Sequence, residues 1–264
     1  MPPRPGYHAP VHAGEGEGES GPGGTGRGAA AVILASGAGV RVGGARNKVY
    51  LPLGGIPVVA WSVRTFAATA GIGALLLVVR PQDQALAGEA LAAGQPGADA
   101  EIIHGGAQRQ DSELMALRHL APRISSGEID VVLMHDAARP LASGGLVSAV
   151  LAAAREPGGA VPGVPRRDVV LASEDGGAAT ADLGTMMAMQ TPQGFPAAPL
   201  LAAYEQAAAD GFYGTDTAAC MTRYSGRPAR CVPGEDRNIK ITYPHDVLIA
   251  EKFLAADGSA PCAR

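Results

Sequence analysis

The chain has 264 residues, a formal net charge of −4 at pH 7 and few aromatic residues. Its longest run of basic residues is the pair Arg166–Arg167, whereas a surface that binds nucleic acid usually carries a basic stripe. No segment has the roughly 20 consecutive apolar residues of a membrane-spanning helix. These features argue against a nucleic-acid partner and against a membrane protein, and they favour a soluble protein.

The two ends of the chain are expected to lie outside the fold. Residues 1–28 are rich in glycine and proline and have no apolar period, so they cannot bury enough surface to offset the entropy lost on ordering. They also lack the apolar core of a signal peptide. We therefore expect a disordered extension over residues 1–28, one domain over residues 29–258 and a flexible tail over residues 259–264.

The cysteines say something about the cellular compartment. Cys220, Cys231 and Cys262 are odd in number and lack the spacing of metal ligands. Such usage is typical of a reducing environment, because disulfide frameworks and metal clusters place cysteines in sets. We expect a cytoplasmic protein.

From residue 31 onwards, short apolar runs alternate with segments of helical period. The apolar runs are expected to be buried parallel strands, and they lie at residues 31–35, 74–79, 101–103, 130–134 and 159–164. The intervening segments predict helices, at residues 58–68, from about 82 to about 93, 108–120 and 145–155. This alternation predicts an α/β fold with a mostly parallel, doubly wound sheet and helices on both faces.

Residues 165–189 interrupt the alternation. They read VVLA, then an EDGG turn, then a run that ends in MAMQ, a pattern typical of a β-hairpin. We expect a projecting β-hairpin arm over this segment. The rest of the chain predicts two helices, two short strands and a last helix that begins at Pro244; these helices and strands lie at residues 199–209, 215–224, 229–232 and 238–241.

Three polar clusters follow predicted strands, and ligands bind outside the carboxyl ends of the strands in open parallel sheets. The first cluster is the glycine-rich stretch Ala35–Lys48, which contains Arg41. Glycines let backbone N–H groups approach an anion closely, and the two basic side chains add positive charge. Taken alone, the stretch fits a flexible loop without a ligand equally well.

A dinucleotide-binding fold is the obvious competitor, because Gly37-x-Gly39 mimics its fingerprint. That fold needs a helix directly after the glycines and an acidic residue about 20 residues further on, at the end of the second strand. Here Pro52 and Pro57 interrupt the required helix, and the second strand ends in Arg80. The dehydrogenase interpretation fails on both counts.

The second cluster is GGAQRQDS at residues 105–112, after the third strand. Gly105 and Gly106 would let a base edge or a phosphate approach the backbone, while Arg109 and Ser112 share the first turn of a helix. An ordinary capped helix start explains the same residues about as well.

The third cluster, HDAARP, ends the fourth strand. Asp136 at the mouth of a buried strand suits a hard divalent cation such as Mg²⁺. Arg139 could instead pair with Asp136 for purely structural reasons, and Pro140 fixes the turn between strand and helix. His135 is expected to pack or cap rather than to take part in catalysis.

Six stretches carry a family resemblance over residues 31–254. They read SGAGVR…NKVYLPLGG, GGAQRQDS, VVLMHDAARPL, QTPQGF, TDTA and NIKITYPHDVLIAE. In this order they resemble the cytidylyltransferases that make 4-diphosphocytidyl-2-C-methylerythritol in the non-mevalonate isoprenoid pathway, together with their ribitol-5-phosphate cytidylyltransferase relatives. The resemblance implies a nucleotidyltransferase-type sheet. It is specific for the superfamily and less specific for the substrate.

The resemblance also implies a role for each matching residue. The residues that would bind CTP are Ala35, Ser36, Gly37 and Gly39 in the glycine-rich loop and Gly105, Gly106, Arg109 and Ser112 around the cytosine. Arg41 and Lys48 would face the phosphates, and Asp136, followed by Arg139, would hold Mg²⁺. Lys240 would contact the acceptor phosphate, and Thr191 and Thr215 would complete the substrate site.

The implied reaction requires cancellation of charge rather than a protein nucleophile. CTP and a phosphorylated alcohol are both polyanions, and attack of the acceptor phosphate on the α-phosphorus needs them held in line. Arg41, Lys48 and Mg²⁺ on Asp136 would supply the positive charge. A phosphate monoester is already ionised near neutral pH, so no general base is required.

Two departures from the family leave the acceptor open. The family places a threonine and an arginine in its arm, which reach the acceptor phosphate of the neighbouring subunit, and here these positions are Val169 and Leu183. Arg166 or Arg167 could substitute. The leading acceptor is 2-C-methylerythritol 4-phosphate; the alternatives are ribitol 5-phosphate, another polyol phosphate or a phosphonate.

Two further expectations concern catalysis and assembly. A non-catalytic nucleotide-binding paralogue is the alternative from another functional class, but it would have no physical reason to keep the charges of Arg41, Lys48, Asp136 and Lys240. The apolar side chains of the arm would be exposed on a monomer, and an isolated hairpin is marginally stable in water. We therefore predict a homodimer formed through residues 165–189.

Overall fold

The computed structural model describes residues 28–37, 47–94, 99–166, 171–172, 178–179 and 186–257. The expectations for the N-terminal extension up to residue 27 and for the C-terminal tail concern residues outside these ranges, as do those for Gly39, Arg41, Arg167, Val169 and Leu183. Within the described ranges, no helix is both long enough and apolar enough to cross a bilayer.

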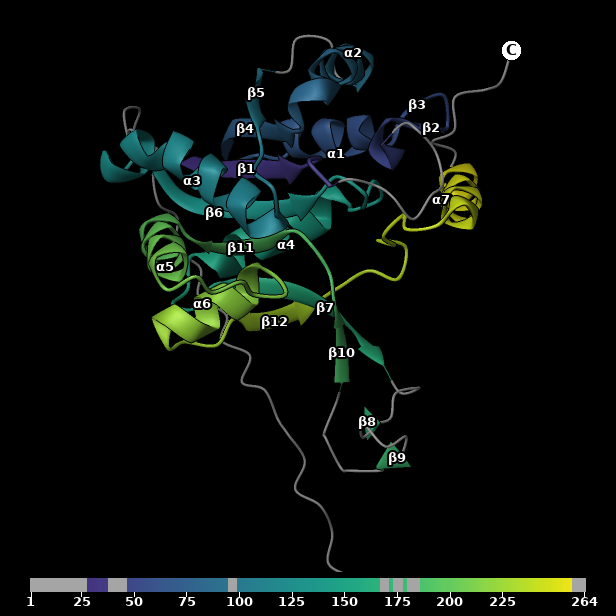
Figure 1. The fold of residues 1–264 in the computed structure, drawn as a ribbon. Helices are drawn as coiled ribbons and strands as arrows, with labels where there is room; N and C mark the ends of the chain where they lie inside the picture. Colours follow the sequence, from purple (N-terminus) through teal and green to yellow (C-terminus); the bar gives the residue numbers. More distant parts are fainter. Residues whose placement is uncertain are drawn as a thin grey trace, which may run out of the picture.

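The centre of the molecule is a mixed, mostly parallel sheet (Figure 1). Its strands are β1 (Gly28–Leu34), β4 (Ile72–Val79), β5 (Ala100–His104), β6 (Ile129–Asp136), β7 (Ala160–Arg166), β10 (Met186–Met189), β11 (Gln193–Pro196) and β12 (Arg230–Pro233). They are ordered β10-β7-β11-β6-β1-β4-β5, and β12 also pairs with β7. Only β10 and β11 run antiparallel to the neighbours that the structure describes. The predicted sheet is confirmed.

Helices cover both faces of the sheet. On one face lie α1 (Val58–Ala67), α2 (Gln84–Gly94) and α4 (Gly144–Ala154), and on the other lie α3 (Arg109–Ser125), α5 (Ala197–Ala209) and α6 (Thr217–Ser225). Alternation along the strands produces the two layers, because successive side chains of a strand point to opposite faces. Ile33 and Leu133 pack with the first set of helices, and Val32 and Met134 with the second.

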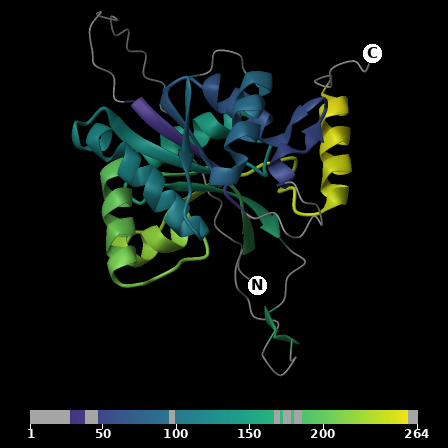
Figure 2. The same ribbon diagram turned by 45° about the horizontal axis from the view of Figure 1, so that its top comes forward.

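The last helix, α7 (Pro244–Ala256), lies apart from these two layers, beside the short strands β2 (Pro52–Leu53) and β3 (Ile56–Pro57) (Figure 2). Ala250 and Leu254 of α7 belong to a small core of their own with Leu53 and Val58. This core joins α7 to the segment between β1 and α1 and includes Ile241, the residue after Lys240. Two short 3₁₀ turns, Lys48–Tyr50 and Pro81–Asp83, contribute residues to the lining of the cavity described below.

The base of the predicted arm is present as expected. β7 and β10 form an antiparallel ladder in which Met186 pairs with Arg166 and Met189 with Gly163. Beyond it, β8 (Leu171–Ala172) pairs with β9 (Ala178–Ala179), away from the body of the sheet (Figure 1).

One predicted strand is wrong, and one strand of the central sheet was missed, as were the short strands β2 and β3. Residues 238–241 form a loop rather than a strand, because the amide of Asn238 closes a turn onto Glu235 O and the amide of Ile241 donates to Ala138 O. The missed strand, β11, is inserted antiparallel between β6 and β7. Its sequence, QGFP, is too short and too rich in Gly and Pro to show a strand period.

Candidate active site

A cavity of about 620 Å³ opens at the carboxyl ends of β1, β4, β5 and β6. This is the edge at which open α/β sheets bind ligands. The segments that line it come from far apart in the chain, and its lining residues include Ala35, Ser36, Gly37, Lys48, Arg80, Gly105, Gly106, Arg109, Asp136 and Lys240. The structure therefore brings all three predicted polar clusters, and Lys240, to one place.

Asp136 is the acidic side chain among the described residues of this lining. As the last residue of β6 it is buried, and its two carboxylate oxygens accept from different cations: Oδ1 from Arg109 Nη1 at 2.5 Å and Oδ2 from Lys240 Nζ at 2.7 Å. Burial alone would raise the pKa of this carboxyl group, but Arg109, Lys240 and Arg139 hold it well below its usual range. Asp136 is consequently ionised throughout the neutral range.

Lys240 reaches Asp136 because residues 238–241 are a loop. The Ile241 amide donates to Ala138 O at 2.8 Å, and Arg139 Nη1 donates to Asn238 O at 2.7 Å. These contacts tie the loop to the turn that follows Asp136. The Lys240 side chain remains 40% exposed, so its ammonium group can meet a ligand in the cavity.

Arg109 stands at the start of α3 and bridges two carboxylates. Nη1 donates to Asp136, and Nε donates to Glu113 Oε1 at 3.0 Å. Burial lowers the pKa of Arg109, but Asp136 and Glu113 outweigh that effect and raise it overall. The remaining nitrogen, Nη2, is buried and has no hydrogen-bond partner among the described residues. Such a donor is costly to leave unpaired, by about 1–3 kcal/mol, and an oxygen from a ligand would satisfy it.

The paired glycines after β5 are required by close packing. A Cβ on Gly105 would lie 2.5 Å from Ser112 Oγ, and one on Gly106 would lie 2.4 Å from Asp111 Cβ. Ser112 itself is buried: its hydroxyl donates to Gln108 O and accepts from the Gly106 amide, and it lies 2.9 Å from Ser36 Oγ. Ser112 thus joins the second cluster to the first and shapes the loop between them.

The described part of the glycine-rich loop also borders the cavity. Gly37 is exposed, and a Cβ there would meet nothing within 4 Å. At the other end of the loop, buried Asn47 donates to Ala35 O at 2.9 Å and to Asp83 Oδ2 at 3.3 Å. Asn47 therefore closes the loop and places the next residue, Lys48, in the cavity wall.

Besides Ser112, three of the described residues that were predicted for the site do not line the cavity. The guanidinium group of Arg139 donates to Asn238 O and Met189 O rather than to Asp136. Thr191 is buried, and its hydroxyl accepts from the Asp136 amide at 3.0 Å. Thr215 is exposed, just before the residue that caps α6. In this structure Thr191 hydrogen-bonds to Asp136, and Arg139 hydrogen-bonds to the loop that carries Lys240.

The packing role expected for His135 is confirmed. It is fully buried, its Nε2 lies within hydrogen-bonding distance of Ser62 Oγ and Arg139 O, and its Nδ1 lies 3.2 Å from Thr191 Oγ1. Burial lowers the pKa of His135 to about 4. The imidazole is therefore neutral near pH 7.

Two functional candidates were missed from the sequence. Arg80 lines the cavity and is held by Asp83 at 2.8 and 3.0 Å; it was considered only as the end of a strand. Glu113, which holds Arg109, follows it by four residues on α3, the spacing at which opposite charges meet on one helix face. That spacing was the signal in the sequence that could have identified Glu113 as a partner of Arg109.

A metal ion would find a limited set of ligands in this cavity. Among the described residues, no group of three or more His, Cys, Asp or Glu side chains could hold one. Mg²⁺ is often bound by one or two carboxylates together with substrate phosphates and water, and each Asp136 oxygen retains a lone pair besides the one used by its cation. The donor set therefore fits Mg²⁺ only when a ligand supplies further oxygens.

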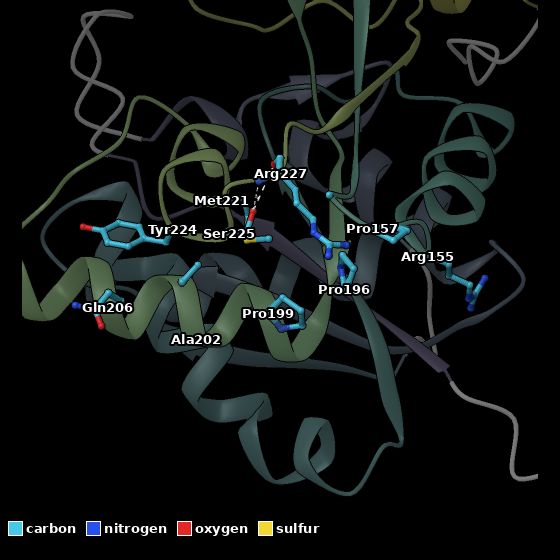
Figure 3. A pocket seen from close by; sticks show the side chains of 12 residues that line it. Arg155, Pro157, Pro196, Pro199, Ala202, Gln206, Met221, Tyr224, Ser225 and Arg227 are labelled. Carbon is cyan, nitrogen blue, oxygen red and sulfur yellow. Dashed lines mark hydrogen bonds between the residues drawn. The ribbon is translucent and has the colours of Figure 1, made fainter.

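A second cavity, of about 700 Å³, lies between α5, α6 and the loop after α4 (Figure 3). Its lining includes Pro196, which pairs with Val131 near the start of β6, whereas Asp136 ends that strand. None of the described residues of the six sequence motifs lines it. Among the lining residues that the structure describes, Arg155 and Arg227 are the charged ones, and none is a carboxylate. The site is accordingly assigned to the first cavity.

Comparison with known proteins identifies the family of this chain. The family model described as 2-C-methyl-D-erythritol 4-phosphate cytidylyltransferase matches residues 29–256. Proteins of that name from Geobacter metallireducens and Cereibacter sphaeroides are 38% and 40% identical to the chain, over 84% and 85% of it and 96% of each relative.

Solved structures show the same architecture. The 4-diphosphocytidyl-2C-methyl-D-erythritol synthase of Anaerococcus prevotii superposes with a TM-score of 0.74 at 26% identity, covering 87% of this chain and 96% of that one. The 2-C-methyl-D-erythritol 4-phosphate cytidylyltransferase of Thermus thermophilus superposes with a TM-score of 0.66 at 30% identity, covering 86% and 99%. The chain is a member of the 2-C-methyl-D-erythritol 4-phosphate cytidylyltransferase family.

Proposed function

We propose that the protein transfers CMP from CTP to 2-C-methyl-D-erythritol 4-phosphate and releases pyrophosphate. The observation that carries this proposal is a cavity whose described lining has one acidic side chain, Asp136, and four basic ones, those of Lys48, Arg80, Arg109 and Lys240. A wall with this excess of positive charge suits two polyanionic substrates. Membership of the family suggests which polyanions they are.

The reaction forms one P–O bond and breaks one. An oxygen of the acceptor phosphate attacks the α-phosphorus of CTP, and the bond to the β-phosphate breaks with its electron pair leaving on pyrophosphate. The acceptor phosphate is already ionised, so no proton has to be removed. The protein contributes position and charge: Lys48 and Arg41 toward the triphosphate, and Lys240 toward the acceptor phosphate.

Mg²⁺ is part of this proposal, with Asp136 as its protein ligand and phosphate oxygens of CTP completing its coordination. When bound, the ion would neutralise charge on the α-phosphate and on the leaving pyrophosphate. Lys240 has the exposure needed to leave Asp136 for the acceptor, while Arg109 stays in place through its second carboxylate partner.

Cytosine selection is assigned to the loop at Gly105 and Gly106. Both glycines line the cavity, and a Cβ on either would collide with neighbouring atoms. The Ser112 hydroxyl is already used within the loop, so we assign recognition of the base to backbone groups. A purine base is larger than cytosine and would not fit the same backbone groups. We therefore expect ATP and GTP to be poor substrates.

The test is a CTP-dependent pyrophosphate-release assay with candidate acceptors. We expect turnover with 2-C-methyl-D-erythritol 4-phosphate, dependence on Mg²⁺ and little activity with ATP. Turnover with ribitol 5-phosphate or a phosphonate alcohol, but not with 2-C-methyl-D-erythritol 4-phosphate, would reassign the acceptor. Absence of turnover with every acceptor would favour a non-catalytic nucleotide-binding protein.

The acceptor contacts deserve a separate experiment, because Val169 and Leu183 replace a hydroxyl and a guanidinium group of the family. One charge-assisted hydrogen bond contributes about 1.5–3 kcal/mol. The double variant Val169→Thr, Leu183→Arg is therefore expected to lower KM for 2-C-methyl-D-erythritol 4-phosphate by roughly 10-fold. If Arg166 or Arg167 has taken over this contact, Arg166→Ala or Arg167→Ala should raise that KM instead.

We also propose that the protein is a homodimer formed through residues 165–189. β10 lies at one end of the sheet order, and Met186 and Met189 are 39% and 38% exposed on it. Edge strands with apolar side chains favour pairing with another chain.

A further inference from the structure

Glu113 is a buried carboxylate that does not line the cavity. It lies on α3 with 1% of its surface exposed and accepts three hydrogen bonds. Oε1 accepts from Arg109 Nε at 3.0 Å and from Thr217 Oγ1 at 2.9 Å, and Oε2 accepts from Tyr204 Oη at 2.6 Å. Its partners come from α3, α5 and α6, so three helices converge on one charge.

Stability alone gives a poor reason for a charge at this position. The same side of α3 packs Leu117 and Leu120 against the sheet, and removing a carboxylate from water costs several kcal/mol unless it is paired. Replacing a buried ion pair by apolar residues of similar size is often neutral or stabilising. A functional role explains Glu113 better, and it would act through the residue that Glu113 contacts.

That residue is Arg109, whose planar guanidinium group is fixed at two edges. Nε points to Glu113 and Nη1 points to Asp136. With both carboxylates in place, the plane and direction of the guanidinium group are determined, as in other two-point arginine contacts. Without Glu113, the guanidinium group would keep the contact between Nη1 and Asp136 but could turn about it.

Glu113 is itself held from the side opposite the cavity. Tyr204 and Thr217 are both buried, with at most 1% exposed. Burial, followed by the charge of Glu113, raises the pKa of Tyr204 well above its usual value, so the phenol stays protonated and donates. The chain of contacts runs from α5 and α6 through Glu113 and Arg109 to Asp136 in the cavity.

We infer that Glu113 is a positioning residue for the reaction: through Arg109 it fixes the direction in which the Asp136 carboxylate faces the substrates. This inference rests on the proposed function of the cavity. Arg109 is the fixed partner of Asp136, and Lys240, whose described acidic partner is Asp136, is the exchangeable one.

The expected signature is a loss of turnover rather than a loss of substrate binding. Glu113→Gln keeps the shape of the side chain and removes its charge, while the residues that line the cavity stay unchanged. Losing one charge-assisted contact on Arg109 should lower kcat by about 10-fold, with KM for CTP changed by less than about threefold.

A double-mutant cycle with Arg109 tests the inference. In an Arg109→Ala background, Glu113→Gln should lower kcat by no more than about twofold, because Glu113 acts through Arg109. A loss of the same size in both backgrounds would overturn the inference, as would an unchanged kcat in Glu113→Gln alone. Melting temperatures measured in parallel separate a fall in kcat from a fall in folded protein.

Matched variants complete the experiment. Glu205→Gln removes the exposed pair Arg118–Glu205, which joins the same helices α3 and α5 away from the cavity, and should leave kcat unchanged. If Glu113→Gln does not fold, the pair Tyr204→Phe and Thr217→Val removes the outer support and should lower kcat about two- to fivefold each; wild-type kcat in both would overturn the inference.

A crystal structure distinguishes failure of the inference from failure of the proposed function. Wild-type protein without CTP-dependent turnover would refute the function alone. In Glu113→Gln, or in Tyr204→Phe if the former does not fold, we expect the guanidinium plane of Arg109 to turn about its contact with Asp136, which is 2.5 Å long in the wild type. An Arg109 conformation identical to that of the wild type would refute the positioning role, whatever the reaction.

Discussion

Asp136 carries the negative charge among the described residues of a basic cavity, and its carboxylate contacts two unlike cations. Arg109 is held by a second carboxylate and cannot leave without breaking that contact, whereas Lys240 is 40% exposed on a loop. A phosphate that entered the cavity would compete with Asp136 for Lys240 far more easily than for Arg109. The two cations thus have different roles: Arg109 orients the carboxylate, and Lys240 is available to the substrate.

Lys48 offers the first test at this scale. Lys48→Ala should lower kcat by roughly 100-fold and change KM for CTP much less, because a donor aimed at charge that develops in the transition state contributes little to ground-state binding. Steady-state kinetics with CTP check this. Lys252→Ala, an exposed lysine of α7 that does not line the cavity, is the control. A kcat close to that of the wild type would remove Lys48 from the reaction.

The depressed pKa of Asp136 predicts how stability depends on pH. A carboxyl group whose pKa is lower in the folded than in the unfolded state contributes stability above its unfolded value, about 3.9, and loses it as pH falls toward the folded value. The wild type should therefore exceed Asp136→Asn in unfolding free energy at about pH 7, and the difference should shrink below about pH 4. Urea unfolding over that range measures it. Asp236→Asn, an exposed carboxyl of the same loop as Lys240, is the control, and a difference that is constant with pH would contradict the charge argument.

At the scale of elements, the loop that carries Lys240 depends on contacts from behind the cavity. Arg139 donates to Asn238 O, and Gln190 Nε2 donates to Glu235 O at 2.7 Å. Both side chains donate to backbone carbonyl groups, which in a strand would accept from the neighbouring strand instead. The loop is therefore a fixed element without regular secondary structure.

Arg139→Ala should loosen this loop. Losing its charge-assisted contact to Asn238 O, worth about 1.5–3 kcal/mol, frees the segment that positions Lys240. We expect KM for the phosphorylated acceptor to rise by about 10-fold, and KM for CTP to rise less. Kinetics with each substrate varied in turn decide the matter, and Arg230→Ala, exposed on β12, is the control. Equal effects on both substrates would argue that Arg139 acts on the whole cavity rather than on the loop.

The elements that could be predicted from the sequence are those with a strong local period. The runs at β1, β4 and β6 are apolar on both faces, as buried parallel strands must be. The polar clusters predicted after β1, β5 and β6 contribute residues to the cavity lining. β11 and the loop at residues 238–241 could not be predicted, because both take their conformation from distant partners: β6 and β7 for the strand, Ala138 and Arg139 for the loop.

Buried polar contacts could not be predicted either, because they also depend on residues that are distant in sequence. Glu113 appears in the sequence as one more charge on an amphipathic helix, and only the arrangement of α5 and α6 reveals Tyr204 and Thr217 beside it. Arg139 was considered as a partner of Asp136 because the two are close in sequence. The fold instead directs its side chain to carbonyl groups contributed by the arm and by the Lys240 loop.

At the scale of the whole molecule, the cavity and the arm are mechanically linked. Met189 ends β10, its carbonyl oxygen accepts from Arg139 Nη2 at 3.3 Å, and Arg139 also holds the loop of Lys240. Thr191, two residues further on, accepts from the amide of Asp136. A change in the position of the arm would thus reach both Lys240 and Asp136 through short paths.

The state of assembly is the last prediction. Met186 and Met189 are exposed on β10, which lies at one end of the sheet order, and a natural edge strand is usually protected by charge or covered. We expect light scattering to report a dimer at micromolar concentration, and Met186→Lys with Met189→Lys to shift it to monomer. Met115→Lys, at a methionine of α3 that is 44% exposed, is the matched control and should remain a dimer. Because β10 leads into the residues that contact Arg139 and Asp136, the monomeric variant should also lose activity, and the loss should ease as protein concentration rises. A wild-type monomer, or a dimer that survives both lysines, would place the contact elsewhere.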